Sequence, residues 1–170
     1  MNMNKYIALV KKQEELLQFP HFNRRDAWDL GNIFVAEILN KNLELAVSIR
    51  LLSGMVLFQY APEGTGLNNE HWMTRKFNLV RDKEQSSLLT LLIWKEKKES
   101  VLQQGLDPGK YVACGGGFPI RIKNSGVAGA ALVSGLPHLT DHDMLVEGIG
   151  RYLRITNAPR IPANVKIPME

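Results

Sequence analysis

The first forty residues place apolar side chains at helical spacing. In residues 4–19 these side chains recur every three or four positions among Lys and Glu, and Pro20 ends the pattern. A second such pattern opens at Asp26, whose carboxylate can accept hydrogen bonds from the first amides of a helix, and it continues to Leu39. The sequence therefore predicts two amphipathic helices before the first strand.

Alternation replaces helical spacing after residue 45. In residues 46–52 apolar and polar side chains alternate, and the Ser53-Gly54 pair supplies a tight turn into residues 55–60. This combination predicts a β-hairpin with one face of its first strand directed at a core.

Two further helices are predicted in the middle of the chain. One begins at Asn68 or Asn69, which can cap it, and carries apolar residues as far as Leu79. The other covers residues 86–104 and ends at Gly105. Its dense apolarity predicts burial on more than one side.

The last third of the chain returns to strands. We expect strands at residues 111–114, 118–123 and 127–134, followed by a helix that begins near Thr140. Three prolines prevent regular structure in a tail at residues 156–170, which we expect to be extended and able to wrap a neighbouring chain. Together these elements predict an α+β fold, an α/β/α sandwich with a central five-stranded antiparallel sheet flanked by helices.

Composition limits the class of protein more than it indicates chemistry. The 170 residues are 45% hydrophobic and 22% charged, which is typical of a single globular domain over residues 1–170. The net charge of +4 is dispersed, so nucleic acid is not an expected partner. The longest apolar run is far shorter than a membrane span, and a single cysteine excludes an internal disulfide. Because no apolar signal core follows the N-terminus, we expect a cytoplasmic protein without membrane contact.

Three consecutive glycines, Gly115, Gly116 and Gly117, lie between Cys114 and Phe118. Glycine tolerates positive φ and the close approach of other atoms. This run therefore predicts either a strand connection with unusual dihedral angles or a loop that cradles a ligand. A strand and not a helix follows it, which excludes both the P-loop and the Rossmann fingerprint.

A second candidate site lies on the helix after the hairpin. On a helix, Trp72 lies one turn from Arg75 and Lys76, with Asn69 one turn earlier on the same side. An indole beside two cations suits a carboxylate or phosphate on a flat ligand, and Arg121 adds a third cation if its sheet face meets this helix. The same pattern is as typical of a cation resting on a partly exposed Trp, or of an ion pair between subunits.

His138, Asp141 and His142 have the residue types of a metal site. No further cluster of ligands completes a tetrahedral set, so we predict no metal there. Asp141 then favours the N-terminus of the last helix, and His142 makes an ordinary hydrogen bond. Cys114 is the obvious candidate nucleophile, and it would need a cationic or helix-terminal neighbour for activation.

Three sequence runs together indicate a family. NNEHWMTRK, GGGFPIRI and GVAGAALVSGLPHLTDH resemble the GlcG and HbpS-like superfamily, also called the haem-degrading domain, and most closely its uncharacterised cytoplasmic branch in bacteria and fungi. The resemblance covers about residues 4–154. It implies the sandwich fold, homo-oligomers and, in some members, bound haem, for which His142, His71 and His138 are candidate axial ligands. Since no Cys-x-x-Cys-His motif occurs, any haem would be held non-covalently.

Three hypotheses for function follow. The first is an oligomeric protein that binds haem or another small planar anion. Its candidate ligand-binding residues are Asn69, Trp72, Arg75, Lys76, Gly115, Gly116, Gly117, Arg121 and His142. The alternative is a structural homo-oligomer without a ligand, in which Trp72, Arg75 and the tail serve subunit contacts. The third is an enzyme, whose reaction these residues do not identify.

Overall fold

A computed structural model describes residues 2–169 of the chain. Two helices precede a hairpin, two more helices follow it, and two strands lead to the last helix. The elements are α1 (Met3–Leu16), α2 (Arg24–Asn40), β1 (Ala46–Leu51), β2 (Val56–Tyr60), α3 (Leu67–Lys83), α4 (Ser87–Lys97), β3 (Gly117–Ile122), β4 (Gly126–Ser134) and α5 (His138–Leu153).

The strands form one antiparallel sheet in the order β2-β1-β4-β3. The sheet has four strands in the described residues, so the predicted fifth strand at 111–114 is wrong. Phe19 takes the outer edge of β3: its N–H donates to the Arg121 carbonyl at 2.7 Å and its carbonyl accepts from the Lys123 N–H at 2.8 Å. Residues 112–114 instead run as buried coil beside the helices.

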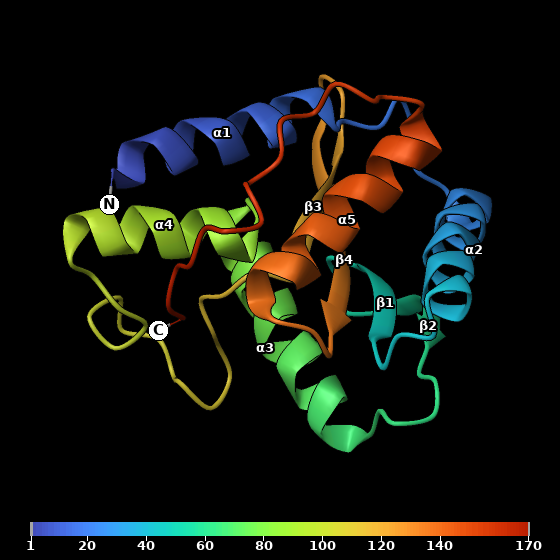
Figure 1. Cartoon of the computed structure of the whole chain (residues 1–170), viewed down its shortest axis with the longest axis horizontal. Helices are drawn as coiled ribbons and strands as arrows, with labels where there is room; N and C mark the ends of the chain where they lie inside the picture. Colours follow the sequence, from blue (N-terminus) through green and yellow to red (C-terminus); the bar gives the residue numbers. More distant parts are fainter. Residues whose placement is uncertain (1, 170) are drawn as a thin grey trace.

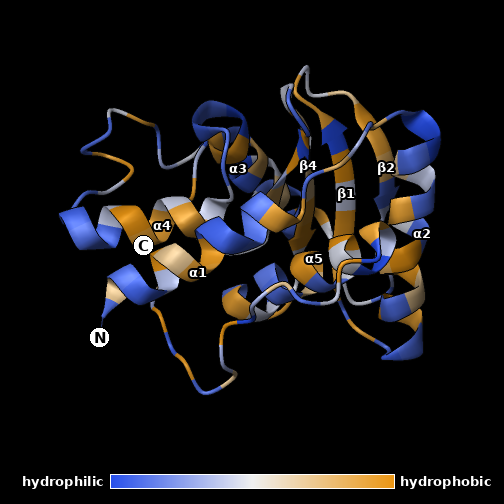
Figure 2. Ribbon diagram, turned by 90° about the horizontal axis from the view of Figure 1, so that it is seen from above, coloured by the Kyte–Doolittle hydropathy of each residue, from blue (hydrophilic) through white to orange (hydrophobic). Residues whose placement is uncertain are grey.

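Helices cover both faces of the sheet, as predicted. α2 and α5 pack on one face and α3 on the other (Figure 1). The alternation in β1 explains this layering, because Val47 and Ile49 belong to the core under α2 and α5, whereas Ala46 packs with Met73 and Phe77 of α3. Figure 2 shows the strands β1 and β4 as largely hydrophobic ribbons between these helices.

A third apolar cluster lies beyond the sheet, where α1 packs along α4 (Figure 1). The C-terminal tail joins it: Ile167 is buried there, with Ile161 and Val165 packed against it. Residues 155–169 contain no helix or strand, as predicted. The tail thus packs in part against its own chain, and its contact with a neighbouring chain stays a prediction.

Several helix boundaries differ from the predictions. α2 begins earlier, because Asn23 accepts a hydrogen bond from the Asp26 N–H and the Asp26 carboxylate accepts from the Asn23 N–H. α4 is shorter than predicted and ends where Lys98 takes the left-handed conformation. α5 begins at His138 and not near Thr140, with Pro137 at its N-cap.

Among the helices of residues 2–169, none is long and apolar enough to cross a membrane.

Candidate functional site

An open pocket of about 290 Å³ lies beside the start of α5. It is formed by the first half of α3, the turn after β4, the beginning of α5 and the end of the tail. Its lining residues are Asn68, Asn69, Trp72, Lys76, Cys114, Ser134, Gly135, Leu136, Pro137, His138, Asp141 and Met169. Three of the residues predicted on the helix after the hairpin, Asn69, Trp72 and Lys76, therefore meet at one surface.

The floor of the pocket is a buried ion pair. The Lys76 Nζ lies 3.0 Å from the Asp141 carboxylate and donates to the Val133 carbonyl at 2.8 Å, and each of the paired side chains is 3% exposed. The other Asp141 oxygen accepts from the Leu136 N–H at 3.0 Å. Burial raises the pKa of Asp141, while the Lys76 ammonium and these hydrogen bonds oppose that rise. The charge of Lys76 is thus already compensated by protein.

The rim of the pocket carries a stacked cation. The Arg75 guanidinium lies 4.2 Å from the centre of the Trp72 ring, which confirms the predicted side-by-side arrangement of indole and cation. Arg75 itself lies outside the lining and points toward the Pro108 carbonyl, 3.4 Å away. Asn69 is fixed by two bonds, accepting from the Gly66 N–H and donating to the Ser134 carbonyl.

The three glycines lie behind the pocket and do not line it. A Cβ on Gly115 would lie 2.0 Å from the His138 carbonyl oxygen, and one on Gly116 would lie 2.5 Å from the Lys76 Nζ. Gly116 also has φ of +111°. Protein atoms therefore fill the space that a ligand would need, and close packing with unusual dihedral angles accounts for this run.

Two predicted site residues lie elsewhere. Arg121 donates to the Glu84 carbonyl at the C-terminal end of α3, the opposite end from Asn69. His142 is buried in the core, where its Nε2 donates to the Gln13 Oε1 at 2.8 Å. Burial lowers the pKa of His142 to about 3, so the ring is neutral. This hydrogen bond to Gln13 is the ordinary one expected above.

Cys114 reaches the pocket wall but is poorly suited to nucleophilic chemistry. Burial raises the pKa of its thiol to about 11, although Lys76 and Arg75 oppose the rise. The thiol therefore stays protonated at neutral pH, and the thiolate is the reactive form. In the described part of the chain, no three His, Cys, Asp or Glu side chains gather as metal ligands.

Ser134, Met169 and the Lys76–Asp141 pair are site features that sequence reasoning missed. His138 and Asp141 are three residues apart, so they share a helix face once the helix begins at His138. That spacing was visible in the sequence, and placing the helix start near Thr140 concealed it. No local signal pointed to Met169, since it reaches the pocket only through the path of the tail.

These features define a class: an α+β protein with an antiparallel sheet between helices and a polar pocket where one strand turns into the last helix. The chain belongs to the family described as haem-degrading protein HbpS-like, and the model of this family matches residues 22–150. This finding confirms the resemblance that the three sequence runs indicated.

Relatives of similar length align with most of this chain. It is 34% identical to the UPF0303 protein YE1367 of Yersinia enterocolitica over 154 residues, which cover 90% of this chain and 91% of that one. It is 37% identical to the UPF0303 protein mlr5144 of Mesorhizobium japonicum over 150 residues, or 88% and 89% of the two chains.

Solved structures show the same fold. The Ybr137w protein aligns with a TM-score of 0.79 at 25% identity, covering 87% of this chain and 88% of that one. The haem complex of PduOC aligns with a TM-score of 0.64 at 18% identity, covering 81% and 96%. At the latter identity the likeness concerns the fold alone.

Proposed function

We propose that the chain binds a small planar ligand that carries a carboxylate, in the pocket between α3 and the start of α5. One observation carries the proposal: an open pocket with polar groups on its floor and an indole under an arginine at its rim. Flat ligands stack on such a ring, and the planar guanidinium matches a carboxylate. Within residues 2–169 no carboxylate forms an ion pair with Arg75, so its charge is available to a ligand.

Haem is the member of this ligand class that the family suggests, and PduOC forms a haem complex. The residues fit it in part. Met169 lines the pocket and belongs to a residue type that ligates haem iron, whereas the Cys114 thiol in the pocket wall stays protonated. The volume of about 290 Å³ lies at the lower end of the range for drug-sized ligands, and a porphyrin is larger than most of these. As it stands the pocket fits a smaller planar acid, and haem needs the tail to move.

The test is a titration of the purified chain with haem and with the metal-free protoporphyrin IX. We expect a shifted Soret band and saturable binding of both compounds, and weaker binding by Trp72→Ala. The control is Leu102→Ala, because Leu102 is an exposed apolar residue that lines no part of the pocket. An unchanged Soret band at stoichiometric haem, together with no saturable binding of protoporphyrin IX, would contradict the proposal.

The homo-oligomer remains a second candidate, now at a different surface. β2 pairs with β1 on one side only, and around this edge Trp28 is 58% exposed, Met55 51% and Val56 45%. An unpaired strand edge beside apolar side chains can join the same edge of a second copy about a two-fold axis. We expect a dimer or larger assembly in sedimentation, and dissociation by Val56→Lys. A wild-type monomer, or a mass unchanged by the lysine, would count against this interface.

A further inference from the structure

His138 holds both of its ring nitrogens in hydrogen bonds of defined direction. Nδ1 accepts from the Gly115 N–H at 3.1 Å, and Nε2 lies 2.6 Å from the Ile167 carbonyl oxygen. A backbone N–H can only donate and a carbonyl can only accept, so the proton of the neutral ring is on Nε2. Burial lowers the pKa of His138, which agrees with a neutral ring. His138 is therefore a hydrogen-bond donor toward the tail.

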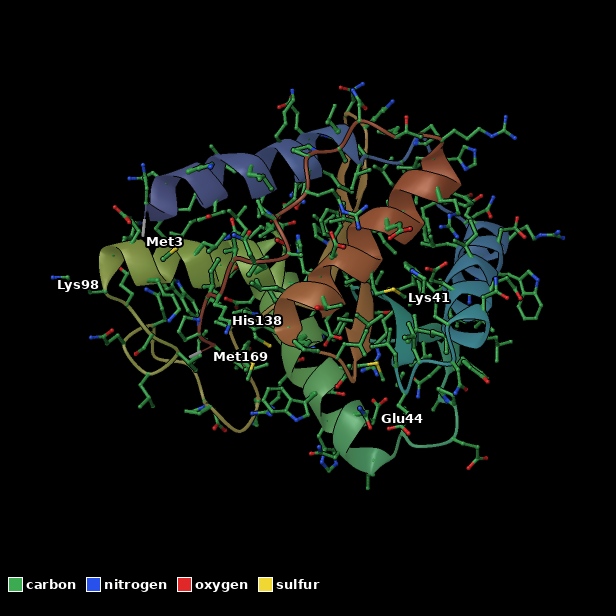
Figure 3. The ribbon with its side chains drawn as sticks, viewed as in Figure 1. Met3, Lys41, Glu44, Lys98, His138 and Met169 are labelled. Atoms are coloured by element: carbon green, nitrogen blue, oxygen red, sulfur yellow. The ribbon has the colours of Figure 1, made fainter. Side chains whose placement is uncertain are left out.

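The same ring separates the pocket from a second, larger hollow. A groove of about 580 Å³ lies between the start of α5 and residues 161–168, and Pro137 and His138 line both spaces. Ile167 and Pro168 line the groove, whereas Met169 lines the pocket. Figure 3 shows His138 and Met169 close together at this point. The end of the tail thus runs across the boundary between the two spaces.

The attachment of the tail changes at Arg160. Up to that point polar contacts fix it: the Gln13 side chain donates to the Pro159 carbonyl at 2.7 Å, and Arg160 pairs with Asp143 and with Glu147. Residues 161–169 have no regular structure, and their one buried side chain is Ile167, which is 4% exposed, with Ile161 and Val165 half-buried beside it. Displacement of this segment would therefore leave the contacts of Pro159 and Arg160 intact.

We propose that residues 161–169 are an internal competitor for the ligand, and that the ligand takes over the hydrogen bond that His138 Nε2 now donates to the Ile167 carbonyl. The inference rests on the proposed function and adds the recognising group and its regulation. The ligand needs an acceptor oxygen, which a carboxylate supplies. With the tail displaced, the α5 side of the groove and the pocket form one continuous open surface with His138 at its centre, because the other wall of the groove is the displaced segment itself.

The hydrogen bond from Gly115 also decides what His138 does not do. A histidine that ligates a metal through one nitrogen normally donates the proton of the other to an acceptor. Here Nδ1 faces a donor, so Nε2 keeps its proton and is unsuited to bind iron. His138 is accordingly a carboxylate-recognising residue and not an axial ligand.

The first test weakens the packing of residues 161–169 in the full chain. Ile167→Ser removes its main apolar contact, and we expect it to bind protoporphyrin IX at least about fivefold more tightly, since the fraction of open sites rises. Asn164→Ser, at an exposed position of the same segment, is the matched control and leaves the affinity unchanged. Equal affinity of wild type and Ile167→Ser would overturn the inference and leave the proposed function intact. No binding of either porphyrin by any variant would overturn both.

A measurement on the wild-type chain does not depend on the folding of a variant. Tryptic cleavage after Lys166 should become faster when protoporphyrin IX saturates the site, because the ligand displaces this segment from α5. Unchanged or slower cleavage after Lys166 at saturating ligand would overturn the inference.

The role of His138 is tested by two substitutions in the Ile167→Ser background. His138→Asn keeps an acceptor near the Gly115 N–H but removes the donor at the Nε2 position, whereas His138→Gln retains a donor of similar reach. We expect His138→Asn to weaken the binding of haem and of protoporphyrin IX by similar factors of about tenfold. With His138→Gln, most of this affinity should return. The ferric haem spectrum should stay the same in both variants. Loss of haem binding alone, with an altered spectrum, would show iron ligation and overturn the assignment.

Discussion

The rim and the floor of the pocket are built from one helix, yet they differ in what occupies their polar groups. Trp72 and Arg75 at the rim are half-buried and face no carboxylate in the described residues, whereas Lys76, the next residue along α3, is paired with Asp141. Two consecutive residues of the helix thus carry a cation that the fold pairs with a carboxylate and a cation that no carboxylate of the described residues pairs with. Charge in a sequence motif therefore indicates a binding site only where the fold leaves that charge uncompensated.

The strongest test of this contrast is Lys76→Met. It leaves the Asp141 carboxylate buried without its partner, so we expect the free energy of unfolding to fall by roughly 3–5 kcal/mol. Denaturant unfolding measures the change. Lys110→Met, at an exposed position, is the matched control and should change stability by less than about 0.5 kcal/mol. Similar small effects of both substitutions would show that the floor does not depend on the pair.

The stability of the chain should also depend on pH, through His142 on the buried side of α5. Its pKa of about 3 in the folded chain lies below the ordinary value of 6.5, so the unfolded chain binds the proton first. The neutral ring contributes fully to the free energy of unfolding above pH 6.5, and this contribution is lost as the pH falls toward 3, by roughly 5 kcal/mol in all. Asp143 opposes this depression, whereas His138 and Arg160 add to it.

Unfolding at several pH values isolates the effect of His142 from the carboxyl groups nearby. The stability of wild type should exceed that of His142→Gln by the largest amount near pH 7, and the difference should shrink toward pH 3. His71→Gln, an exposed control, should give a curve parallel to wild type. A difference between wild type and His142→Gln that stays constant over this range would contradict a neutral buried ring.

The glycine run provides a test of close packing. Gly115→Ala places a methyl group 2.0 Å from a backbone oxygen that cannot easily move, so we expect a loss of about 3 kcal/mol in unfolding free energy. Gly66→Ala is the control, because its Cβ meets nothing within 4 Å and its backbone is extended, and we expect less than about 1 kcal/mol. If Gly115→Ala is as stable as wild type, the run has space that a ligand could enter.

Sequence periodicity predicted those helices and strands well that bury one face against the core and expose the other. The hairpin and the layering follow from the alternation of residues 46–52, and β4 pairs with β1 as a central strand. The fifth strand failed because residues 111–114 are apolar enough for a strand, while Phe19, distant in sequence, already holds the sheet edge.

The site was predictable only as far as local spacing reaches. The contact between Trp72 and Arg75 lies within one turn of α3, and sequence spacing found it. The pairing of Lys76 with Asp141 joins two elements 65 residues apart, and the place of Met169 depends on the whole path of the tail. Without the fold, no pattern shows that Arg121 binds the Glu84 carbonyl or that His142 is buried against Gln13, so the sequence predicted both in the site.

The smallest expected change in stability comes from Arg75→Ala, and it sharpens the contrast most directly. A cation stacked on a partly exposed ring contributes about 0.5–1 kcal/mol, so the unfolding free energy should fall by no more than that. Binding should suffer more, with the affinity for protoporphyrin IX about tenfold lower, because a charged hydrogen bond to the carboxylate is lost. Arg75→Lys keeps the charge without the planar fork, and its affinity for protoporphyrin IX should lie between those of wild type and Arg75→Ala. If Arg75→Ala instead destabilises the chain as much as Lys76→Met while porphyrin affinity stays unchanged, the rim serves the fold and the ligand binds elsewhere.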